Sequence, residues 1–179
     1  MRCRVLGTLA AIYLAAASGA RAQQHAGPSG RDDSRPRADG PDLTGTWVLN
    51  RAKSDFGLLP APGADTARYT RAGNVYHVVE ASASDTGAVQ VTYSWPAGAG
   101  EVTSDLPDQE ASILTRVTVH GDTALFVSQL RHNARAIEIE SGREYLSPDG
   151  KVRTREYDLQ SLVNPDEDTQ HILIVFDRQ

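Results

Sequence analysis

Cysteine is almost absent from this sequence of 179 residues, and its single example is Cys3. Residues 1–22 have the pattern of a secretory signal peptide: arginines precede an apolar run, and Ala20-Arg21-Ala22 forms an A-x-A-like cleavage site. Cleavage before Gln23 would leave a mature chain without cysteine. We therefore expect no disulfide, no thiol nucleophile and no cysteine-ligated metal in the mature protein.

Long apolar runs are also scarce. The apolar run of the signal segment, residues 5–17, is shorter than the roughly 20 apolar residues that a membrane-spanning helix requires. We therefore expect a cleaved signal rather than an anchor. The expected location is periplasmic or extracellular, with no integral membrane segment after cleavage.

Positive charge is in deficit as well. Residues 1–22 contain three of the 18 Lys/Arg and none of the 23 Asp/Glu, which leaves 15 basic against 23 acidic residues and a net charge of −8. A mildly acidic chain without clustered Lys or Arg lacks the electrostatic footprint of a nucleic-acid binder. We expect a soluble monomer without a nucleic-acid partner.

Residues 23–41 contain no Leu, Ile, Val or aromatic side chain and are rich in Gly, Pro, Asp and Arg. Such a composition buries too little apolar surface to offset the entropy of ordering. We predict a disordered spacer at 23–41 and a single domain at 42–179.

Within this domain, short stretches of alternating polarity are separated by turn residues. They cover residues 46–50, 67–71, 75–81, 88–95, 113–120, 123–131, 136–146, 151–159 and 171–176. Short strands at this spacing, without a helical period between them, indicate an antiparallel sandwich or barrel. A single helical turn is expected near Pro107–Ala111.

Gly121-Asp122 predicts a two-residue hairpin loop with a type II′ turn. This turn pairs His120 with Thr123 and places Val117 opposite Phe126. The resulting register gathers apolar residues on one face, so the turn and the face pattern agree.

A second hairpin surrounds Ser147-Pro148-Asp149-Gly150. Its turn residues favour pairing Ser147 with Lys151, which sets Arg143 opposite Arg155. A slip of one residue would instead face Glu144 with Arg155. We favour the register set by the turn, because exposed ion pairs contribute little.

The domain opens with LTGTWVLNRAKSDFG, residues 43–57. Gly45-x-Trp47 at the start of the first strand resembles the opening motif of lipocalins and the wider calycin barrels. The longer string resembles exported bacterial proteins with this lipocalin-like start, largely without assigned function. In that group a Ser-Pro-Asp-Gly-Lys hairpin, here Ser147–Lys151, precedes a late strand. The resemblance implies an all-β fold, namely an antiparallel up-and-down (meander) β-barrel of about 8–10 strands.

The resemblance also suggests a structural plug. Gly45 lacks a Cβ and would let the chain cross closely under the barrel mouth, while Trp47 would close that end with a large apolar surface. In lipocalins an arginine at the far end of the last strand covers this Trp, and Arg178 is placed to do so by a cation–π contact. Alternatively, Trp47 is ordinary core and Arg178 a frayed terminal residue. Trp95, at a strand end, is expected to be more exposed.

Motifs for chemistry are not visible. The sequence has no Gly-x-Ser-x-Gly elbow. The domain's histidines have no metal-ligand spacing; they are His77, His120, His132 and His171. We therefore predict no catalytic residue, no cofactor and no metal, and an enzyme whose residues converge from distant segments stays an open alternative. Glu138 and Glu140 alternate with isoleucines, which predicts a solvated face for both glutamates.

The inner face of the predicted barrel is the remaining candidate site. Its candidates beside aliphatic residues are His77, Tyr93, Thr115, Phe126 and Ser128. An apolar cavity with a few polar groups is the usual form of a small-molecule site. We hypothesise an exported barrel that binds a small apolar or amphipathic molecule. The alternative is an envelope protein-interaction module using the outer sheet face, which carries Leu114, Leu125 and Val127 among charges.

Overall fold

The computed structural model describes residues 40–84, 87–106, 110–164 and 166–179. The predicted signal peptide and the spacer up to residue 39 lie outside these ranges. The described elements are β1 (Gly45–Leu49), η2 (Arg51–Lys53), β2 (Ala64–Ala72), β3 (Val75–Ser84), β4 (Gly87–Pro96), β5 (Gly100–Leu106), β6 (Ala111–His120), β7 (Thr123–His132), β8 (Arg135–Leu146), β9 (Val152–Ser161) and β10 (Gln170–Arg178).

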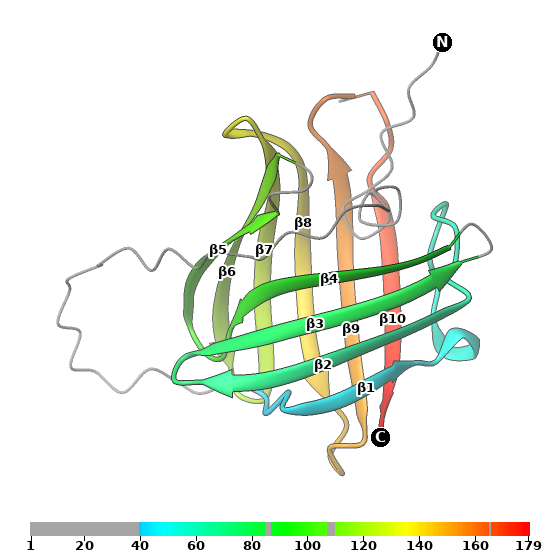
Figure 1. The fold of residues 1–179 in the computed structure, drawn as a ribbon, viewed down its shortest axis with the longest axis vertical. Helices are drawn as coiled ribbons and strands as arrows, with labels where there is room; N and C mark the ends of the chain where they lie inside the picture. The colour runs from blue at the N-terminus through cyan, green and yellow to red at the C-terminus, as the bar shows by residue number, and fades with distance from the viewer. Residues whose placement is uncertain (1–39, 85–86, 107–109, 165) are drawn as a thin grey trace, which may run out of the picture.

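The strands form one antiparallel sheet in the order β4-β3-β2-β1-β10-β9-β8-β7-β6-β5. Figure 1 shows the sheet curled on itself, with β1–β4 crossing in front of β6–β10 at a steep angle. Its two ends, β4 and β5, are tied by Ser104, whose Oγ accepts from Ser94 N at 2.8 Å and donates to Ser94 O at 3.3 Å. The predicted antiparallel meander barrel is therefore confirmed, with ten strands in the described chain.

All nine predicted strands are present, and β5 is an addition that the sequence pattern did not indicate. This strand begins at Gly100 and carries only Val102 and Leu106 as apolar residues. It is also a terminal strand of the sheet order, paired with β6. The predicted helical turn near Pro107–Ala111 falls largely on residues 107–109, outside the described ranges, and Ala111 begins β6.

The hairpin of β6 and β7 has the predicted register. His120 pairs with Thr123, Val117 with Phe126, and Ile113 with Leu130. Gly121 has a φ of 58°, the left-handed region that a type II′ turn requires at its first central position. The predicted apolar face of this hairpin points into the barrel, where Val117 and Phe126 are both buried.

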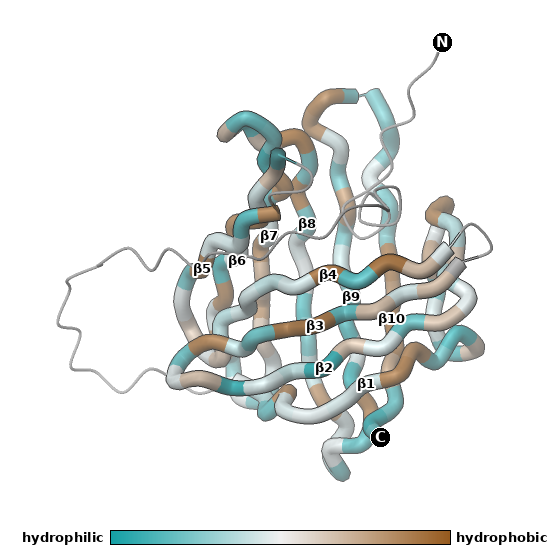
Figure 2. The backbone as a smooth tube through the Cα atoms, in the orientation of Figure 1, coloured by the Kyte–Doolittle hydropathy of each residue, from teal (hydrophilic) through white to brown (hydrophobic). Residues whose placement is uncertain are grey.

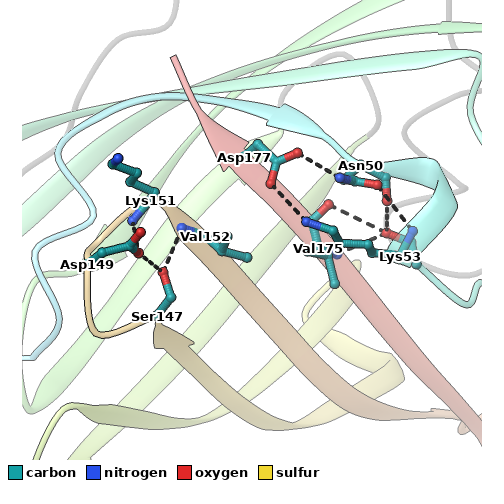
Figure 3. A network of polar contacts seen from close by, with 9 residues as sticks. Asn50, Lys53, Ser147, Asp149, Lys151, Val152, Val175 and Asp177 are labelled. Carbon is teal, nitrogen blue, oxygen red and sulfur yellow. Dashed lines mark hydrogen bonds and ion pairs between the residues drawn. The ribbon is translucent and has the colours of Figure 1, made fainter.

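The favoured register of the hairpin of β8 and β9 was wrong. Glu144 pairs with Arg155 and Arg143 with Glu156, the arrangement one residue away from the prediction. The turn accommodates this slip because Ser147 Oγ donates to Asp149 Oδ1 at 2.6 Å and accepts from Val152 N at 2.9 Å (Figure 3). Glu144 and Arg155 are buried inside the barrel, so the small stabilisation expected of exposed ion pairs does not apply to them.

Gly142 of β8 lies directly against the backbone of β9. A Cβ on Gly142 would lie 2.1 Å from the carbonyl oxygen of Glu156 and 2.6 Å from the Tyr157 Cβ. No side chain fits such a space, so glycine allows β9 to approach β8 closely here. The small residue also makes room for Tyr157 and Phe126, which flank it on the neighbouring strands.

The chain ahead of β1 packs against the closed end of the barrel. Gly40 N donates to Ala97 O at 3.4 Å, and Pro41 O accepts from the Tyr76 hydroxyl at 3.2 Å. The Tyr76 hydroxyl in turn accepts from Leu43 N at 3.1 Å. Gly40 and Pro41, which fall in the predicted spacer, therefore contact the barrel.

The segment after β1 is held against β10 by polar contacts. Asn50 Nδ2 donates to Asp177 Oδ2 at 2.7 Å, and Lys53 lies 3.6 Å from the same carboxylate. Ser54 Oγ accepts from Val175 N at 2.9 Å. The Asn50 side chain also accepts from Lys53 N and so caps η2. These contacts link β1 and β10, the first and last described strands along the chain.

Hydrophobic and hydrophilic residues alternate along the strands (Figure 2), as expected when one sheet face is buried. A large core cluster fills the closed end and middle of the barrel and includes Trp47, Tyr69 and Tyr157. A smaller cluster of Val91, Leu106 and Leu130 packs nearer the opposite end. The barrel interior is therefore well filled around its closed end.

Candidate functional site

Four of the five predicted ligand-binding residues lie on the inner face. Thr115 Oγ1 and Ser128 Oγ are 3.0 Å apart and share a hydrogen bond. The Tyr93 hydroxyl donates to Glu80 Oε2 at 2.9 Å, and Phe126 packs edge-on against Trp95 at 5.3 Å between ring centroids. A role for these four in ligand binding stays a prediction.

His77 is placed differently from the expectation. Its neighbours Tyr76 and Val78 are fully buried, while Val79 is exposed. Because side chains alternate across a strand, His77 shares the outer face with Val79. The sequence argument placed the wrong set of β3 residues inside, because Val75 and Val79 look like core residues.

The closed end holds the predicted plug residues together. Trp47 is fully buried and its Nε1 donates to Leu43 O at 2.7 Å. The Arg178 guanidinium lies 4.6 Å from the centre of the Trp47 ring system and donates to Asp42 O at 3.0 Å. Gly45 has a φ of 126°, but a Cβ there would meet no atom within 4 Å. Its backbone conformation, rather than close approach, therefore requires glycine.

Trp95 is not the exposed residue that its place at a strand end suggested. Only 2% of its surface is accessible. Its ring packs against Phe126 and lies 4.9 Å from the Arg155 guanidinium. The chain beyond Pro96 turns back under the barrel, and Ala97 N donates to Asn74 O at 2.8 Å, which covers this strand end.

Two arginines alternate along β9 and point into the barrel. The Arg153 guanidinium lies 4.0 Å from the Phe176 ring centre and 4.8 Å from that of Tyr69. The Arg155 guanidinium lies 4.3 Å from Phe126 and 5.3 Å from Tyr157. Each cation is thus stacked on aromatic rings, which stabilises a buried guanidinium.

Two inward glutamates of β8 face these arginines. Arg155 Nη2 donates to Glu140 Oε2 at 2.8 Å, and Arg153 Nε lies 3.6 Å from Glu144 Oε1. Burial alone would lower the pKa of Arg155, but the Glu140 and Glu144 carboxylates raise it above its usual value. Arg155 therefore keeps its charge inside the barrel.

The solvated face predicted for Glu138 and Glu140 was wrong, since both are buried. Glu138 pairs with Leu130 and Glu140 with Ser128, so they share the inner face with these β7 residues. Reversed polarity misled the sequence argument, because apolar residues normally occupy the inner face. The slipped hairpin register would have indicated the inner position of Glu140, because it places Arg155 on the same sheet face as Glu140 and Glu144.

A pair of carboxyl groups lies on the neighbouring wall of the barrel. Asp65 on β2 is 7% exposed, and Glu80 on β3 receives the Tyr93 hydrogen bond. Burial first, and then the nearby Glu80 charge, raise the pKa of Asp65 to about 8, although Ser82 and Arg153 act in the opposite direction. Asp65 is therefore largely protonated at neutral pH.

Several buried charged groups have polar atoms without a hydrogen-bond partner in the described protein. The atoms are Asp65 Oδ1, both carboxylate oxygens of Glu144, Nε and Nη1 of Arg153, and Nε of Arg155. Buried polar atoms are rarely left in this state. The interior thus combines aromatic walls with charged groups that can accept or donate further hydrogen bonds.

The outer face has a separate hollow of about 430 Å³ over β7–β10, lined among others by Leu125, Arg143 and His171. Arg143 donates hydrogen bonds to Glu156 Oε2 from Nη2 at 2.7 Å and from Nε at 2.9 Å. The hydrogen bond that Asp158 Oδ1 accepts from His171 Nδ1, 2.9 Å away, raises the pKa of His171. Within the described ranges, no group of three or more His, Cys, Asp or Glu is arranged to hold a metal ion.

No described helix combines the length and apolar character needed to cross a membrane. No protein-family model matches the chain. A search of the curated proteins likewise gives no match.

Twelve chains among the solved structures match the fold. A secretary abundant heat soluble (SAHS) protein from Ramazzottius varieornatus is similar over 80% of this chain and 100% of its own, with a TM-score of 0.52 and 12% identity. Lipid binding protein 8 from Caenorhabditis elegans covers 76% of this chain and 94% of its own (TM-score 0.46, 13% identity). Fatty-acid-binding protein 1 from Echinococcus granulosus covers 76% and 96% (TM-score 0.42, 11% identity). The ten-stranded antiparallel meander and the similarity at a TM-score of 0.52 together show a lipocalin-like barrel fold.

Proposed function

We propose that this protein binds a small amphipathic molecule inside its barrel. The observation that carries the proposal is the set of buried charged groups with unmade hydrogen bonds, above all Arg153, Glu144 and Asp65. A polar group of a bound molecule supplies the missing partners, and the adjoining aromatic and aliphatic side chains contact its apolar part. Sites for small molecules commonly combine an apolar lining with a few polar groups in this way.

The inner residues of β4, β6 and β7 are the wall against which the apolar part rests. Tyr93 belongs to the edge of both core clusters, and Val91, Leu106 and Leu130 form the smaller one. Thr115 and Ser128 add two hydroxyl groups to this wall. The expected occupant is therefore a molecule with an extended apolar portion and one compact polar group.

A matched pair of variants on β7 tests this proposal. Ser128 is buried on the inner face, and Gln129 follows it on the opposite face. Ser128→Leu adds volume inside the barrel, so we expect it to weaken binding of Nile red or of a co-purified ligand. Gln129→Leu adds the same kind of side chain outside and should leave binding unchanged.

The readout begins with solvent extraction of the purified native protein, mass spectrometry of the extract and a Nile red titration. Far-UV circular dichroism and urea melts show whether the Ser128→Leu protein is folded. The proposal is overturned if nothing is extracted and Nile red does not bind, or if the folded Ser128→Leu protein binds as well as the parent.

We further propose that the barrel acts after export, in the periplasm or outside the cell. The sequence pattern of residues 1–22 supports this proposal. After expression in a bacterial host and fractionation, we expect the protein outside the cytoplasm. Its mass should be that of a chain that begins at Gln23. Retention of residue 1 in a cytoplasmic product would contradict it.

The outer face supports a second candidate function, docking of another envelope protein. Leu125 and Val127 on β7 are 39% and 40% exposed, and Leu125 borders the outer hollow. Leu125→Glu should abolish capture of a partner from an envelope extract. Val79→Glu, at an outer position of β3 with 36% exposure, is the matched control and should have no effect.

A further inference from the structure

The inner wall carries an excess of acid. The described residues whose side chains face inward include five carboxylic acids and two arginines: Asp65, Glu80, Glu138, Glu140, Glu144, Arg153 and Arg155. An interior of low dielectric tolerates charge only when it is paired. Any polar guest in this interior therefore meets more acceptors than cations.

The two arginines are already engaged. Arg155 donates to Glu140 at 2.8 Å, and Arg153 lies 3.6 Å from Glu144. Aromatic rings also lie against both guanidinium groups. The Phe176 ring centre, for example, is 4.0 Å from the Arg153 guanidinium. A carboxylate ligand entering this layer would meet the unpartnered Nε and Nη1 of Arg153, but it would add a further negative charge to a wall that already holds more carboxyl groups than arginines.

Asp65 and Glu80 offer the opposite chemistry. Asp65 is more than nine-tenths buried and its Oδ1 has no hydrogen-bond partner in the described protein. Glu80 accepts a hydrogen bond from the Tyr93 hydroxyl. Both residues face the interior, from the adjacent strands β2 and β3. Together they present carboxyl oxygens to a hydrogen-bond donor.

Apolar surface lies directly beside this pair. Glu80 is register partner to Val91 of β4, and Val91 belongs to the smaller core cluster with Leu106 and Leu130. Tyr93 packs against the same cluster while its hydroxyl bonds Glu80. A molecule with its polar end at Asp65 and Glu80 would therefore place its apolar end against this cluster.

We propose that the barrel selects an amphipathic amine, whose ammonium group donates hydrogen bonds to Asp65 Oδ1 and the Glu80 carboxylate. This inference rests on the proposed interior binding site and specifies the polar group of its ligand. A fatty acid carries the wrong charge for this wall. A neutral alcohol of the same length gains the apolar contacts but lacks the charge-assisted hydrogen bonds.

Competition with Nile red by dodecylamine, dodecanol and dodecanoate, each below its micelle concentration, tests the inference at neutral pH. We expect dodecylamine to bind about tenfold tighter than dodecanol, the factor that one charge-assisted hydrogen bond provides, and dodecanoate to bind most weakly. Glu80→Gln removes the charge but keeps an acceptor for Tyr93. It should abolish the preference for the amine and leave dodecanol binding unchanged.

Two further variants complete the design. Asp65→Leu removes the Oδ1 acceptor and should weaken amine binding in the same direction, which guards against a folding defect specific to Glu80→Gln. Glu101→Gln, at an exposed residue paired with Arg116, is the control and should keep the amine preference. Equal affinities for amine and alcohol, tighter binding of dodecanoate, or a Glu80→Gln protein that still prefers the amine would each overturn the inference. Failure of all three probes to displace bound Nile red would also overturn it, whereas the absence of both an extracted ligand and Nile red binding would overturn the proposed function itself.

Discussion

Replacing Asp65 by asparagine should stabilise the barrel, and the gain should grow with pH. The pKa of Asp65 is raised from 3.8 to about 8, first by burial and then by the Glu80 charge. Between these values the folded protein holds a proton that the unfolded chain has released. The free energy of unfolding therefore falls as pH rises through this window and levels off above about pH 8.

The magnitude follows from the shift. One pKa unit corresponds to about 1.4 kcal/mol, so the change from 3.8 to about 8 amounts to a loss of about 6 kcal/mol at the alkaline end. Asparagine does not ionise and keeps the shape of the side chain. Part of the gain is offset because its amide must also find partners in a buried site, which costs about 1–3 kcal/mol. We expect a net stabilisation of roughly 3–5 kcal/mol at alkaline pH.

Urea melts at several pH values measure this effect. Because m-values of small proteins are about 1–3 kcal/mol per molar urea, the midpoint of Asp65→Asn should rise by one to several molar near pH 8. Near pH 4 it should fall slightly, because the cost of burying the amide remains while the gain from removing the ionisable group is almost lost. Asp122→Asn, in the exposed turn between β6 and β7, is the control and should shift neither curve. A midpoint that is unchanged or lowered near pH 8, or a difference that does not depend on pH, would refute the reasoning.

Further predictions concern Gly142, where β8 and β9 lie close together, and the two buried tryptophans. Gly142→Ala places a Cβ 2.1 Å from the Glu156 carbonyl oxygen, so urea melts should show that the free energy of unfolding falls by about 3 kcal/mol or more. Gly40→Ala is the control and should cost far less, because its Cβ would have contacts of 3.5 Å and longer. Trp47→Ala and Trp95→Ala each remove a buried ring and should each cost about 3–5 kcal/mol; a small shift in either urea midpoint would contradict its place in the core. Trp47→Ala alone should also remove the stacking partner of Arg178, so proteolysis near the C-terminus should become faster in that variant only.

The parts of the fold that the sequence predicted are those in which local turn chemistry and face polarity agree. At Gly121-Asp122 the turn fixed the register and the apolar residues confirmed it. At Ser147–Gly150 the two signals conflicted, and the prediction followed the turn. The structure follows the charges, because Glu144 and Arg155 share a buried face on which Glu144 lies 3.6 Å from Arg153 and Arg155 donates to Glu140.

The candidate site was predictable only in part, for a related reason. Tyr93, Thr115, Phe126 and Ser128 were placed inside by ordinary alternation with aliphatic neighbours. Glu138 and Glu140 of β8 were assigned to solvent, since the same alternation rule treats charge as a sign of the outer face. Asp65 and Glu80 come together only through the pairing of β2 with β3, which the pattern of either strand alone does not specify.

Stability alone does not account for the charges in this interior. Buried ion pairs contribute little compared with apolar side chains of similar volume, because the cost of removing two charges from water offsets their attraction. Yet the sheet provides space for these groups: Ala67 lies opposite Glu80, and Ala124 lies opposite Glu144. Aromatic rings on Arg153 and Arg155 then limit the cost of burying the cations. A wall arranged in this way gives up some stability and retains polar atoms that a guest molecule can satisfy, which is the property that ligand recognition requires.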